Sequence, residues 1–566
     1  MNPTDSHRNQ SLFLPAVLLV AVAFFVTFFF FPLAYAFVRS IRVDGGFTLA
    51  FYRTLISNPL LADSIVNSLN VGLWATFLSI AIGYLLAWVM FRFSFFGKGF
   101  WGTLLLAPLV LPPFVGAIGI KQVLGKFGMV NSLLMQAGLM DARDPIHWLG
   151  APFWGVVLLE TLHLFPMMCL NICGSFALMD VSLEEAGRNL GARGWSLFRT
   201  VTFPLLLPGV FAGGAIVFIW AFTDLGTPLI FEYAEVAPVQ IFNMVAQAEE
   251  NPAGYALVMV VLAATLALFL PSRFIFGRKR YEAVGFGRAG AAARRLGLPG
   301  QMGVTLFFVL LLSLALLPHA SVIMVSLSRN WFMSVMPEQW TLDHFSGVFT
   351  HKLAFLSMKN SVSLSFASTV VDIALGGAIA YVLARRRFPG RAILDASTML
   401  PLAVPGVVIA FGYVGCFSGT ALDPRVNPFP LLIVSYSIRR LPLVVRALYA
   451  GLIQVDRSLE EAASGLGAAP AAVARTVTLP LISASVVGGG ILAFAFAMLE
   501  VSDSLILAME DRFYPMTKAI YILLGRLMDG PNIASAMGVL GMFLLIASLV
   551  IAQRLLGKRM GQVFRA

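Results

Sequence analysis

Charged side chains are scarce in this sequence. Asp, Glu, Lys and Arg make up 12% of its 566 residues, against roughly a quarter in ordinary soluble domains. Hydrophobic residues account for 59%, and the mean hydropathy is +0.86. The apolar residues come in runs of about 20 or more, the length that crosses roughly 30 Å of hydrocarbon. A water-soluble fold is therefore not expected, and the sequence predicts an all-α polytopic membrane protein.

Cysteine is also rare. The three cysteines, Cys169, Cys173 and Cys416, all lie within apolar runs, where neither a disulfide framework nor a thiolate metal site is expected. No cluster of His, Asp and Glu has catalytic spacing at one consistent membrane depth. The sequence therefore predicts no catalytic residue, no metal site and no cofactor bound by this chain.

Basic residues outnumber acidic ones and give a net charge of +11. They lie in short clusters between the apolar runs and are not interleaved with aromatic residues, so we interpret them as topology signals and not as a nucleic-acid site. With a cytoplasmic N-terminus, most of the 39 Lys and Arg residues fall on the cytoplasmic side. The expected outer loop, residues 232–251, contains glutamates but no Lys or Arg. Both termini are therefore predicted to be cytoplasmic.

Apolar runs bounded by charges or by Gly and Pro clusters predict about twelve crossings, six in each half of the chain. The first run is much longer than the apolar core of a signal peptide, which has roughly 7 to 15 residues, and is kept as a membrane helix. The expected crossings are residues 12–38, 65–91, 100–120, 152–178, 206–231, 253–276, 302–327, 361–384, 393–418, 428–450, 481–500 and 535–556.

The two halves repeat each other. Asn67-Ser68 begins a helix that is followed by a glycine turn and two prolines, and Asn360-Ser361 begins the same pattern 293 residues later. Further on the offset is 276, because the first half has a longer outer loop. An even number of crossings per half makes the repeats parallel, with a pseudo-twofold axis along the membrane normal and a path between the halves. The expected parts are a first repeat at 1–277, a basic cytoplasmic linker at 278–301 and a second repeat at 302–566.

One repeated segment is unusual for a connector between crossings. Residues 180–205 and 456–481 lie on the expected cytoplasmic side and hold helix-favouring residues around a fixed glycine. Each is expected to form a short helix, a bend, and a second helix that starts the next crossing. Ser182 and Ser458 are the candidate N-caps of the first helix. The same charged residues would also suit a surface loop that is merely solvated.

These segments resemble the EAA loop of the permeases of binding-protein-dependent ABC importers. The first copy reads Glu-Ala-Gly from Glu185, and the second reads Glu-Ala-Ala from Glu461, which fits the pattern more closely. The resemblance covers nearly the whole chain. It implies the type I importer permease fold, with two parallel six-helix repeats, in a bacterial inner membrane. It also implies that each loop forms a coupling helix that docks on a separate ATPase. The residues it assigns to coupling are Glu184, Glu185, Ala186, Gly191, Glu460, Glu461, Ala462 and Gly467.

Nucleotide handling is assigned to a partner. A phosphate-binding loop needs two glycines separated by four residues, then Lys and Ser or Thr. The nearest approach, Gly119 to Gly125-Lys126, has five intervening residues and is followed by Phe127. The resemblance implies two copies of a cytoplasmic ATPase that bind ATP and Mg²⁺, and a periplasmic solute-binding protein. Closure of the ATPases would rock the two halves between inward and outward openings.

Polar residues inside or at the ends of crossings are the candidates for lining the path, because ionisable groups there are costly and commonly functional. Interfacial snorkelling or hydrogen bonding between helices is the alternative role for each of them. Acidic residues end the fifth crossing in both halves and suggest a cationic or metal-bearing solute. The path candidates are His163, Asp224, Arg439, Arg440, Glu500 and Asp503.

The cargo is less clearly indicated than the fold. Fusion of both halves, with Tyr-x-x-Arg-Arg-Leu-Pro at 436–442 and Asp-Leu-Gly-Thr-Pro-Leu at 224–229, is most similar to ferric-iron importer permeases. Importers of 2-aminoethylphosphonate or another phosphorylated organic solute, of thiamine and of polyamines are the alternatives. A secondary transporter would also have twofold repeats. It would not need duplicated cytoplasmic loops, and no crossing carries the chain of carboxylates typical of an ion-coupled carrier.

Overall fold

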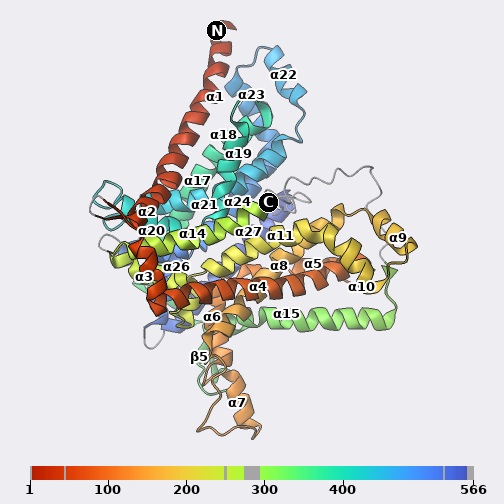
Figure 1. Ribbon diagram of the computed structural model, residues 1–566, viewed down its shortest axis with the longest axis vertical. Coiled ribbons are helices and arrows are strands. Elements are labelled where there is room, and N and C mark those ends of the chain that lie inside the picture. Colours follow the sequence, from red (N-terminus) through yellow and green to blue (C-terminus); the bar gives the residue numbers. More distant parts are fainter. Residues whose placement is uncertain (1–2, 44–45, 248–250, 273–293, 527–529, 557–566) are drawn as a thin grey trace.

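The computed structural model describes residues 3–43, 46–247, 251–272, 294–526 and 530–556. Within these ranges nearly all of the ordered structure is helical, and the strands are two or three residues long. In Figure 1 most long helices of the first half lie in the lower part of the molecule, and those of the second half rise above them. The fold is therefore an all-α bundle made of two sets of helices.

The first half contains long helices joined by short ones. The longest, α4, begins where Asn58 Oδ1 accepts a hydrogen bond from Leu60 N at 3.1 Å and where Pro59 occupies the first turn. The elements are α1 (Pro3–Phe25), η1 (Val26–Phe30), α2 (Phe31–Ile41), α3 (Ala50–Ser57), α4 (Pro59–Arg92), α5 (Lys98–Leu104), η2 (Ala107–Val110), α6 (Pro113–Leu124), α7 (Met129–Gln136), α8 (Pro152–Leu178), α9 (Val181–Asn189), α10 (Gly194–Leu197), η3 (Phe198–Thr202), α11 (Phe203–Thr223), α12 (Gly226–Ile230), α13 (Ala237–Met244), η4 (Val245–Gln247) and α14 (Ala253–Pro271).

The second half follows the same general order of long and short helices, without a helix equivalent to α7 among its described residues. Its helices are α15 (Leu298–Leu327), α16 (Asp343–Thr350), α17 (Lys352–Val371), η6 (Asp372–Gly376), α18 (Gly377–Arg385), α19 (Arg391–Met399), η7 (Leu400–Ala403), α20 (Gly406–Cys416), α21 (Phe429–Leu452), α22 (Arg457–Gly465), α23 (Pro470–Val473), η8 (Ala474–Thr478), α24 (Leu479–Met498), α25 (Ser502–Leu507), η9 (Asp511–Phe513), α26 (Met516–Leu524) and α27 (Gly530–Leu556).

Three small ladders complete the secondary structure of the described residues. Two are antiparallel and lie between neighbouring helices, and the third is parallel and joins the chain after α4 to the chain before α15. The pairs are β1 (Arg42–Val43) with β2 (Gly46–Phe47), β3 (Phe93–Ser94) with β4 (Arg294–Arg295), and β5 (Ser328–Asn330) with β6 (Gln339–Trp340).

Every expected crossing has a helical counterpart in the described residues. In the part of the chain that the structure describes, nine helices are long and apolar enough to cross a membrane, and two further pairs of bent helices pass the same test together. The remaining crossing is α21, which has 24 residues but carries Arg439, Arg440 and Arg446. The nine helices are Phe13–Ile41, Pro59–Arg92, Pro152–Leu178, Gly194–Ile230, Ala253–Pro271, Leu298–Leu327, Lys352–Arg385, Pro470–Met498 and Gly530–Ala552.

The third crossing of each half, predicted as one continuous helix, is broken. The pair α5–η2 and α6–α7 is bent by 90°, and the pair α19–η7 and α20 is bent by 99°. Pro112 and Pro405 stand at the two breaks, and a proline disfavours helical geometry in the residue before it. Leu111 and Val404 are accordingly extended, with ψ of 124° and 120°. The paired prolines were visible in the sequence, but their effect on the helix was not predicted.

The first crossing of each half packs against the opposite half. Helix α2 lies against α20, and α15 lies against α6. Both contacts are close at a glycine, since a Cβ on Gly412 would lie 3.2 Å from the Pro32 carbonyl oxygen and one on Gly119 would lie 2.6 Å from that of Pro318. Small residues allow such close approach of helices in membranes. The two halves are therefore interlocked.

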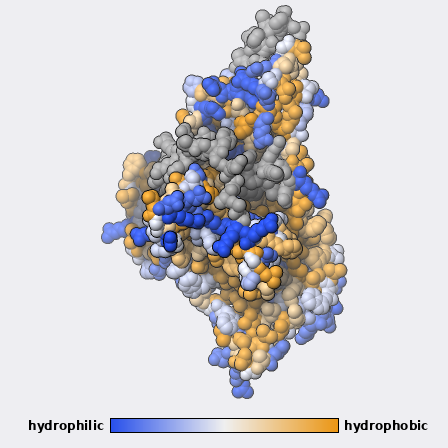
Figure 2. Space-filling view, turned by 90° about the vertical axis from the view of Figure 1, so that its right-hand side faces the viewer, coloured by the Kyte–Doolittle hydropathy of each residue, from blue (hydrophilic) through white to orange (hydrophobic). Residues whose placement is uncertain are grey.

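Apolar side chains fill the interior and also cover the outside. Phe176, Leu86 and Tyr413 are fully buried, whereas Leu19 and Leu310 are 72% and 62% exposed. Figure 2 shows hydrophobic residues over large areas of one face of the molecule. Such an exposed apolar surface would be unfavourable in water and fits contact with lipid.

The linker predicted at 278–301 lies mostly outside the described residues. The part that is described forms β4 next to β3, and α15 begins at Leu298, earlier than the predicted 302. The domain limits at 277 and 302 stay predictions.

Candidate functional site

The two repeated segments, 180–205 and 456–481, fold alike. Helices α9 and α22 are each nine residues long and end before a glycine with positive φ, +89° at Gly191 and +85° at Gly467. Glycine adopts this conformation at no steric cost, so it ends the helix and turns the chain. The next helices, α10–η3–α11 and α23–η8–α24, run into the fifth crossings. The predicted order of helix, bend and helix is confirmed.

The N-caps of α9 and α22 differ from the prediction. Asp180 Oδ1 accepts a hydrogen bond from Ser182 N at 2.9 Å, and Asp456 Oδ1 accepts one from Ser458 N at the same distance. The aspartates are therefore the caps, and the assignment to Ser182 and Ser458 was wrong. These backbone hydrogen bonds lower the pKa of both exposed aspartates, so the carboxylates stay charged next to the positive end of each helix dipole.

Glu184, assigned to the ATPase contact, instead points into the protein. It is 1% exposed, forms an ion pair with Arg92 at the end of α4, and accepts a hydrogen bond from Thr202 Oγ1 at 2.7 Å. Burial raises the pKa of Glu184. The hydrogen bonds from Arg92 and Thr202, together with the Arg92 charge, lower this pKa by more than burial raises it, so the pKa falls overall. A buried carboxylate needs such partners. Glu184 therefore ties α9 to α4 and to η3.

Glu460 makes the equivalent contacts in the second half. Its Oε2 lies 3.2 Å from Arg385 Nε, and its Oε1 accepts a hydrogen bond from Thr478 Oγ1 at 3.0 Å. Arg385 also donates to the Val455 carbonyl at 3.0 Å. Glu460 is 8% exposed, so it anchors α22 to the end of α18 and is not free to meet a partner.

The second glutamate of each motif faces outward. Glu185, Ala186, Glu461 and Ala462 are all exposed. We call the exposed side chains of the two loops the coupling faces, and each face also presents two leucines. Their exposed fractions are 45% for Leu183, 89% for Leu190, 47% for Leu459 and 91% for Leu466.

Leu190 and Leu466 were missed in the sequence. The sequence feature that could have identified them is their position, because each leucine directly precedes the glycine that ends its helix. An exposed apolar side chain at the same place in both copies suits a surface that is covered by a partner.

The substitution Glu460→Gln should loosen α22 locally. Arg385 would lose its carboxylate, and a hydrogen bond to a charged group is worth about 1.5–3 kcal/mol. We expect backbone hydrogen exchange across residues 457–465 to rise roughly tenfold or more, while α9 is unchanged. The control is Glu461→Gln, whose ion pair with Arg457 is exposed on both sides. Equal exchange in the two variants would refute the anchoring role.

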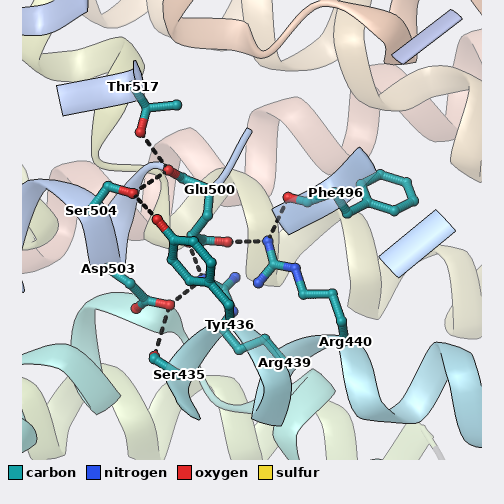
Figure 3. A network of polar contacts seen from close by, with 9 residues as sticks. All are labelled: Ser435, Tyr436, Arg439, Arg440, Phe496, Glu500, Asp503, Ser504 and Thr517. Carbon is teal, nitrogen blue, oxygen red and sulfur yellow. Dashed lines mark hydrogen bonds and ion pairs between the residues drawn. The ribbon is translucent and has the colours of Figure 1, made fainter. Parts of the chain in front are cut away.

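A buried ionic network joins α21 to the end of α24 and to α25 (Figure 3). Arg439 and Arg440 both pair with Glu500. Arg439 Nη1 also lies 3.6 Å from Asp503 Oδ2, and Arg440 Nη2 donates to the Phe496 carbonyl at 3.0 Å. The four ionic path candidates of the second half therefore lie together and form ion pairs within the protein.

Hydroxyl groups complete this network. Ser435 Oγ donates to Asp503 Oδ2 at 2.9 Å, and the Tyr436 hydroxyl lies 2.6 Å from Ser504 Oγ. Ser504 Oγ and Thr517 Oγ1 each donate to the Glu500 carbonyl at 2.6 Å (Figure 3). Two arginines balance two carboxylates, so this acidic end offers no unpaired negative charge to a cation. The inference from acidity to a cationic solute therefore loses its support at Glu500.

At the equivalent end of the fifth crossing in the first half, His163 and Leu164 stand at the positions of Arg439 and Arg440. Thr227 Oγ1 donates to Glu160 Oε1 at 3.1 Å, and Thr227 N donates to Asp224 Oδ2 at 2.8 Å. His163 Nδ1 lies 3.0 Å from the Pro108 carbonyl oxygen near the break in the third crossing. These contacts join helices, which is the alternative role of His163 and Asp224. Whether either residue lines the path stays a prediction.

One further acid joins the end of the fifth crossing in the first half. Folding brings Glu160 of α8 within hydrogen-bonding distance of Thr227 in α12, three residues after Asp224. Among the described residues, no group of three or more His, Cys, Asp and Glu could hold a metal ion. The buried acids are instead bonded to arginines and hydroxyls.

Several curated relatives of this chain are named as transport permeases. The chain is 27% identical over 545 residues to the ferric transport system permease protein FbpB of Actinobacillus pleuropneumoniae, which covers 95% of this chain and 75% of that protein. It is 24% identical over 484 residues to the Fe(3+)-transport system permease protein FbpB 2 of Haemophilus influenzae, with coverage of 85% and 87%. A shorter match, 33% identical over 173 residues, is to the molybdenum transport system permease protein ModB of Escherichia coli and covers 30% of this chain and 71% of that one.

A family match accounts for both halves. The family described as "Binding-protein-dependent transport system inner membrane component" matches residues 79–278 and again residues 373–562. Each match contains one coupling face and the buried polar contacts at the end of one fifth crossing. The matches together cover more than half of the chain. This chain therefore belongs to the binding-protein-dependent transport system inner membrane component family, and is a fused, multi-pass permease of an ABC importer.

Proposed function

We propose that this permease carries ferric iron from a periplasmic solute-binding protein to the cytoplasm, driven by a separate ATPase. The observation that carries the proposal is the length of the match to permeases named for ferric transport, which runs through both repeats. The sequence lacks a phosphate-binding loop, so ATP and Mg²⁺ are assigned to the partner and this chain to transport alone.

Two equivalent coupling faces favour two ATPase copies, one on each face. Each face combines an exposed carboxylate with exposed leucines, which suits a partner groove with a basic rim and an apolar floor. The buried ion pairs of Glu184 and Glu460 explain how movement of the ATPase would reach the membrane-spanning helices. Because Glu184 ties α9 to α4, and Glu460 ties α22 to α18, movement of a docked helix would move a membrane-spanning helix with it.

Docking on a cytoplasmic ATPase would place α9 and α22 on the cytoplasmic side of the inner membrane. Helix α1 contacts α23, next to α22, and the N-terminal end of α1 lies near α22 in Figure 1. This arrangement supports a cytoplasmic N-terminus, in agreement with the distribution of basic residues.

The identity of the transported solute is the part of the proposal that has specific alternatives. Relatives named for molybdenum transport share part of the chain, and phosphorylated organic solutes, thiamine and polyamines stay alternatives. A secondary transporter is disfavoured by the family and by the duplicated coupling faces.

The test is uptake of labelled ferric iron into membrane vesicles that contain the permease, its ATPase and its binding protein. We expect uptake that needs ATP and all three proteins, and that fails when the phosphate-binding lysine of the ATPase is replaced. Labelled molybdate, 2-aminoethylphosphonate, thiamine and putrescine are measured in parallel. ATP-dependent uptake of one of these without iron uptake would reject the iron assignment and keep the importer.

A further inference from the structure

Helices α13 and α26 start at equivalent positions of the two repeats. Ser68 Oγ accepts a hydrogen bond from Ala237 N at 2.8 Å, and Ser361 Oγ accepts one from Met516 N at 2.7 Å. Ser68 and Ser361 belong to the repeated motif, so Ala237 and Met516 are also a repeat pair. The neighbouring Asn67 and Asn360 bond to backbone carbonyls just before these helices in the same way.

Phe242 and Tyr521 each lie five residues after these starts and touch one another. Their ring centroids are 6.5 Å apart, and the planes meet at 87° in an edge-to-face contact. Two equivalent residues of a twofold repeat can touch each other only close to the axis that relates them. The contact therefore marks the pseudo-twofold axis, where a path between the halves is expected.

This aromatic pair lies far from the coupling helices. Helix α4 holds Ser68 near α13 and Arg92 at α9, and these residues are 24 positions apart, which corresponds to about 36 Å along a helix. Ser361, near α26, and Arg385, at α22, are also 24 positions apart. The pair thus lies at the end of the axis opposite the coupling faces.

One ammonium group accompanies the pair. Lys518, one turn before Tyr521, is 8% exposed, and its Nζ donates to the Leu505 carbonyl at 2.7 Å. Nζ also lies 5.3 Å from the centre of the Phe242 ring and 5.6 Å from that of Tyr514, within the range of cation–π attraction.

Lys518 has no acidic partner among the described residues and no basic counterpart in the first repeat. Within the described ranges no Asp or Glu forms an ion pair with it. The equivalent position in α13, two residues after Ala237, is Val239. The contact on the axis therefore carries a single positive charge, contributed by the second half.

We propose that Phe242, Tyr521 and Lys518 form the outer gate of the path, and that the Lys518 charge makes this gate selective for solutes of zero or negative net charge. A positive charge in a water-poor constriction repels cations strongly and attracts anions. For the cargo, this rests on the proposed function: iron would pass as a complex with an anionic ligand and not as a bare ion. The same charge disfavours thiamine and polyamines and favours phosphonates and oxyanions.

Cross-linking in the complex of permease and ATPase tests the gate. Phe242→Cys/Tyr521→Cys is made in a chain whose Cys169, Cys173 and Cys416 are replaced by serine, and is treated with a short bifunctional thiol reagent. We expect efficient cross-linking in the nucleotide-free complex and several-fold less in the vanadate-trapped complex. When ATP is then added to the cross-linked complex, transport-coupled ATP turnover should be lost. The single-cysteine variants are the controls. Equal cross-linking in both states would overturn the gate.

Charged thiol reagents test the selectivity. In the vanadate-trapped complex, Tyr521→Cys is labelled with a sulfonate-bearing or a trimethylammonium-bearing methanethiosulfonate. We expect the anionic reagent to react faster, and Lys518→Met to lower the ratio of the two rates roughly tenfold, whereas Lys518→Arg keeps it. The proposal would be overturned if Tyr521→Cys is not labelled, or if Lys518→Met leaves the ratio of the two labelling rates unchanged. Neither readout uses iron, so failed iron uptake would count against the proposed function alone.

Discussion

The double variant Glu185→Lys/Glu461→Lys should lose ATP-driven uptake by roughly tenfold or more, with normal amounts of folded permease in the membrane. Both side chains are exposed on the coupling faces and make no buried contact that the change would break. Reversed charge opposite a complementary surface costs several kcal/mol of binding, and each 1.4 kcal/mol is a factor of ten. The measurements are uptake in vesicles, stimulation of the ATPase by the loaded binding protein, and co-purification of the ATPase.

The matched control for this prediction is Glu338→Lys, an exposed glutamate in the chain between α15 and α16 and outside both coupling faces. It should leave uptake and co-purification unchanged. Normal uptake by the double variant would remove the docking role from both faces. Loss of folded protein in the double variant alone would mean that these glutamates stabilise the loops instead.

The substitution Glu500→Gln should strongly destabilise the folded protein. Arg439 and Arg440 would both lose the carboxylate that they share, and only Asp503 would remain near Arg439. Removing one member of a buried ion pair costs about 3–5 kcal/mol, because the remaining charge is left without compensation. We expect a clearly lower unfolding temperature of the purified protein in detergent and less permease in the membrane.

Glu510→Gln is the control for that prediction. Glu510 pairs with Arg512 at 2.7 Å, but both side chains are about half exposed or more, so the change should cost less than about 1 kcal/mol. Similar unfolding temperatures for the two variants would show that the network in Figure 3 does not stabilise α21 against α24. Asp224→Asn should fall between them, because the first half has acids and hydroxyls but no arginine at this place.

Sequence patterns were sufficient for the crossings and the repeated loops because these depend on short-range properties. A run of apolar residues predicts a spanning helix whatever its neighbours are, and a Gly after a short amphipathic stretch predicts a helix end. Gly191 and Gly467 have the positive φ that this reasoning implies. The same reasoning failed at Pro112 and Pro405, where the apolar run continues through a bend of about a right angle.

Side-chain roles within the loops were harder to predict. Glu184 and Glu185 are adjacent and chemically identical, yet one is 1% exposed and anchors the loop while the other faces outward. The partners that decide this, Arg92 and Thr202, are 92 and 18 residues from Glu184 in the sequence. Only the tertiary structure brings them together, so the motif alone could not separate the anchor from the docking residue.

By itself, the sequence determined a membrane protein of two parallel repeats with a duplicated coupling loop, because hydrophobic periodicity, charge distribution and internal similarity are local or additive along the chain. The tertiary structure decided which helices of one half pack against the other half and which acids form ion pairs with Arg439 and Arg440. It also decided that Phe242 contacts Tyr521 on the axis. Those contacts join residues 60 or more positions apart, and the last pairing is shifted by three residues from the offset of the loops. Long-range packing sets such contacts, and no local pattern in the chain records them.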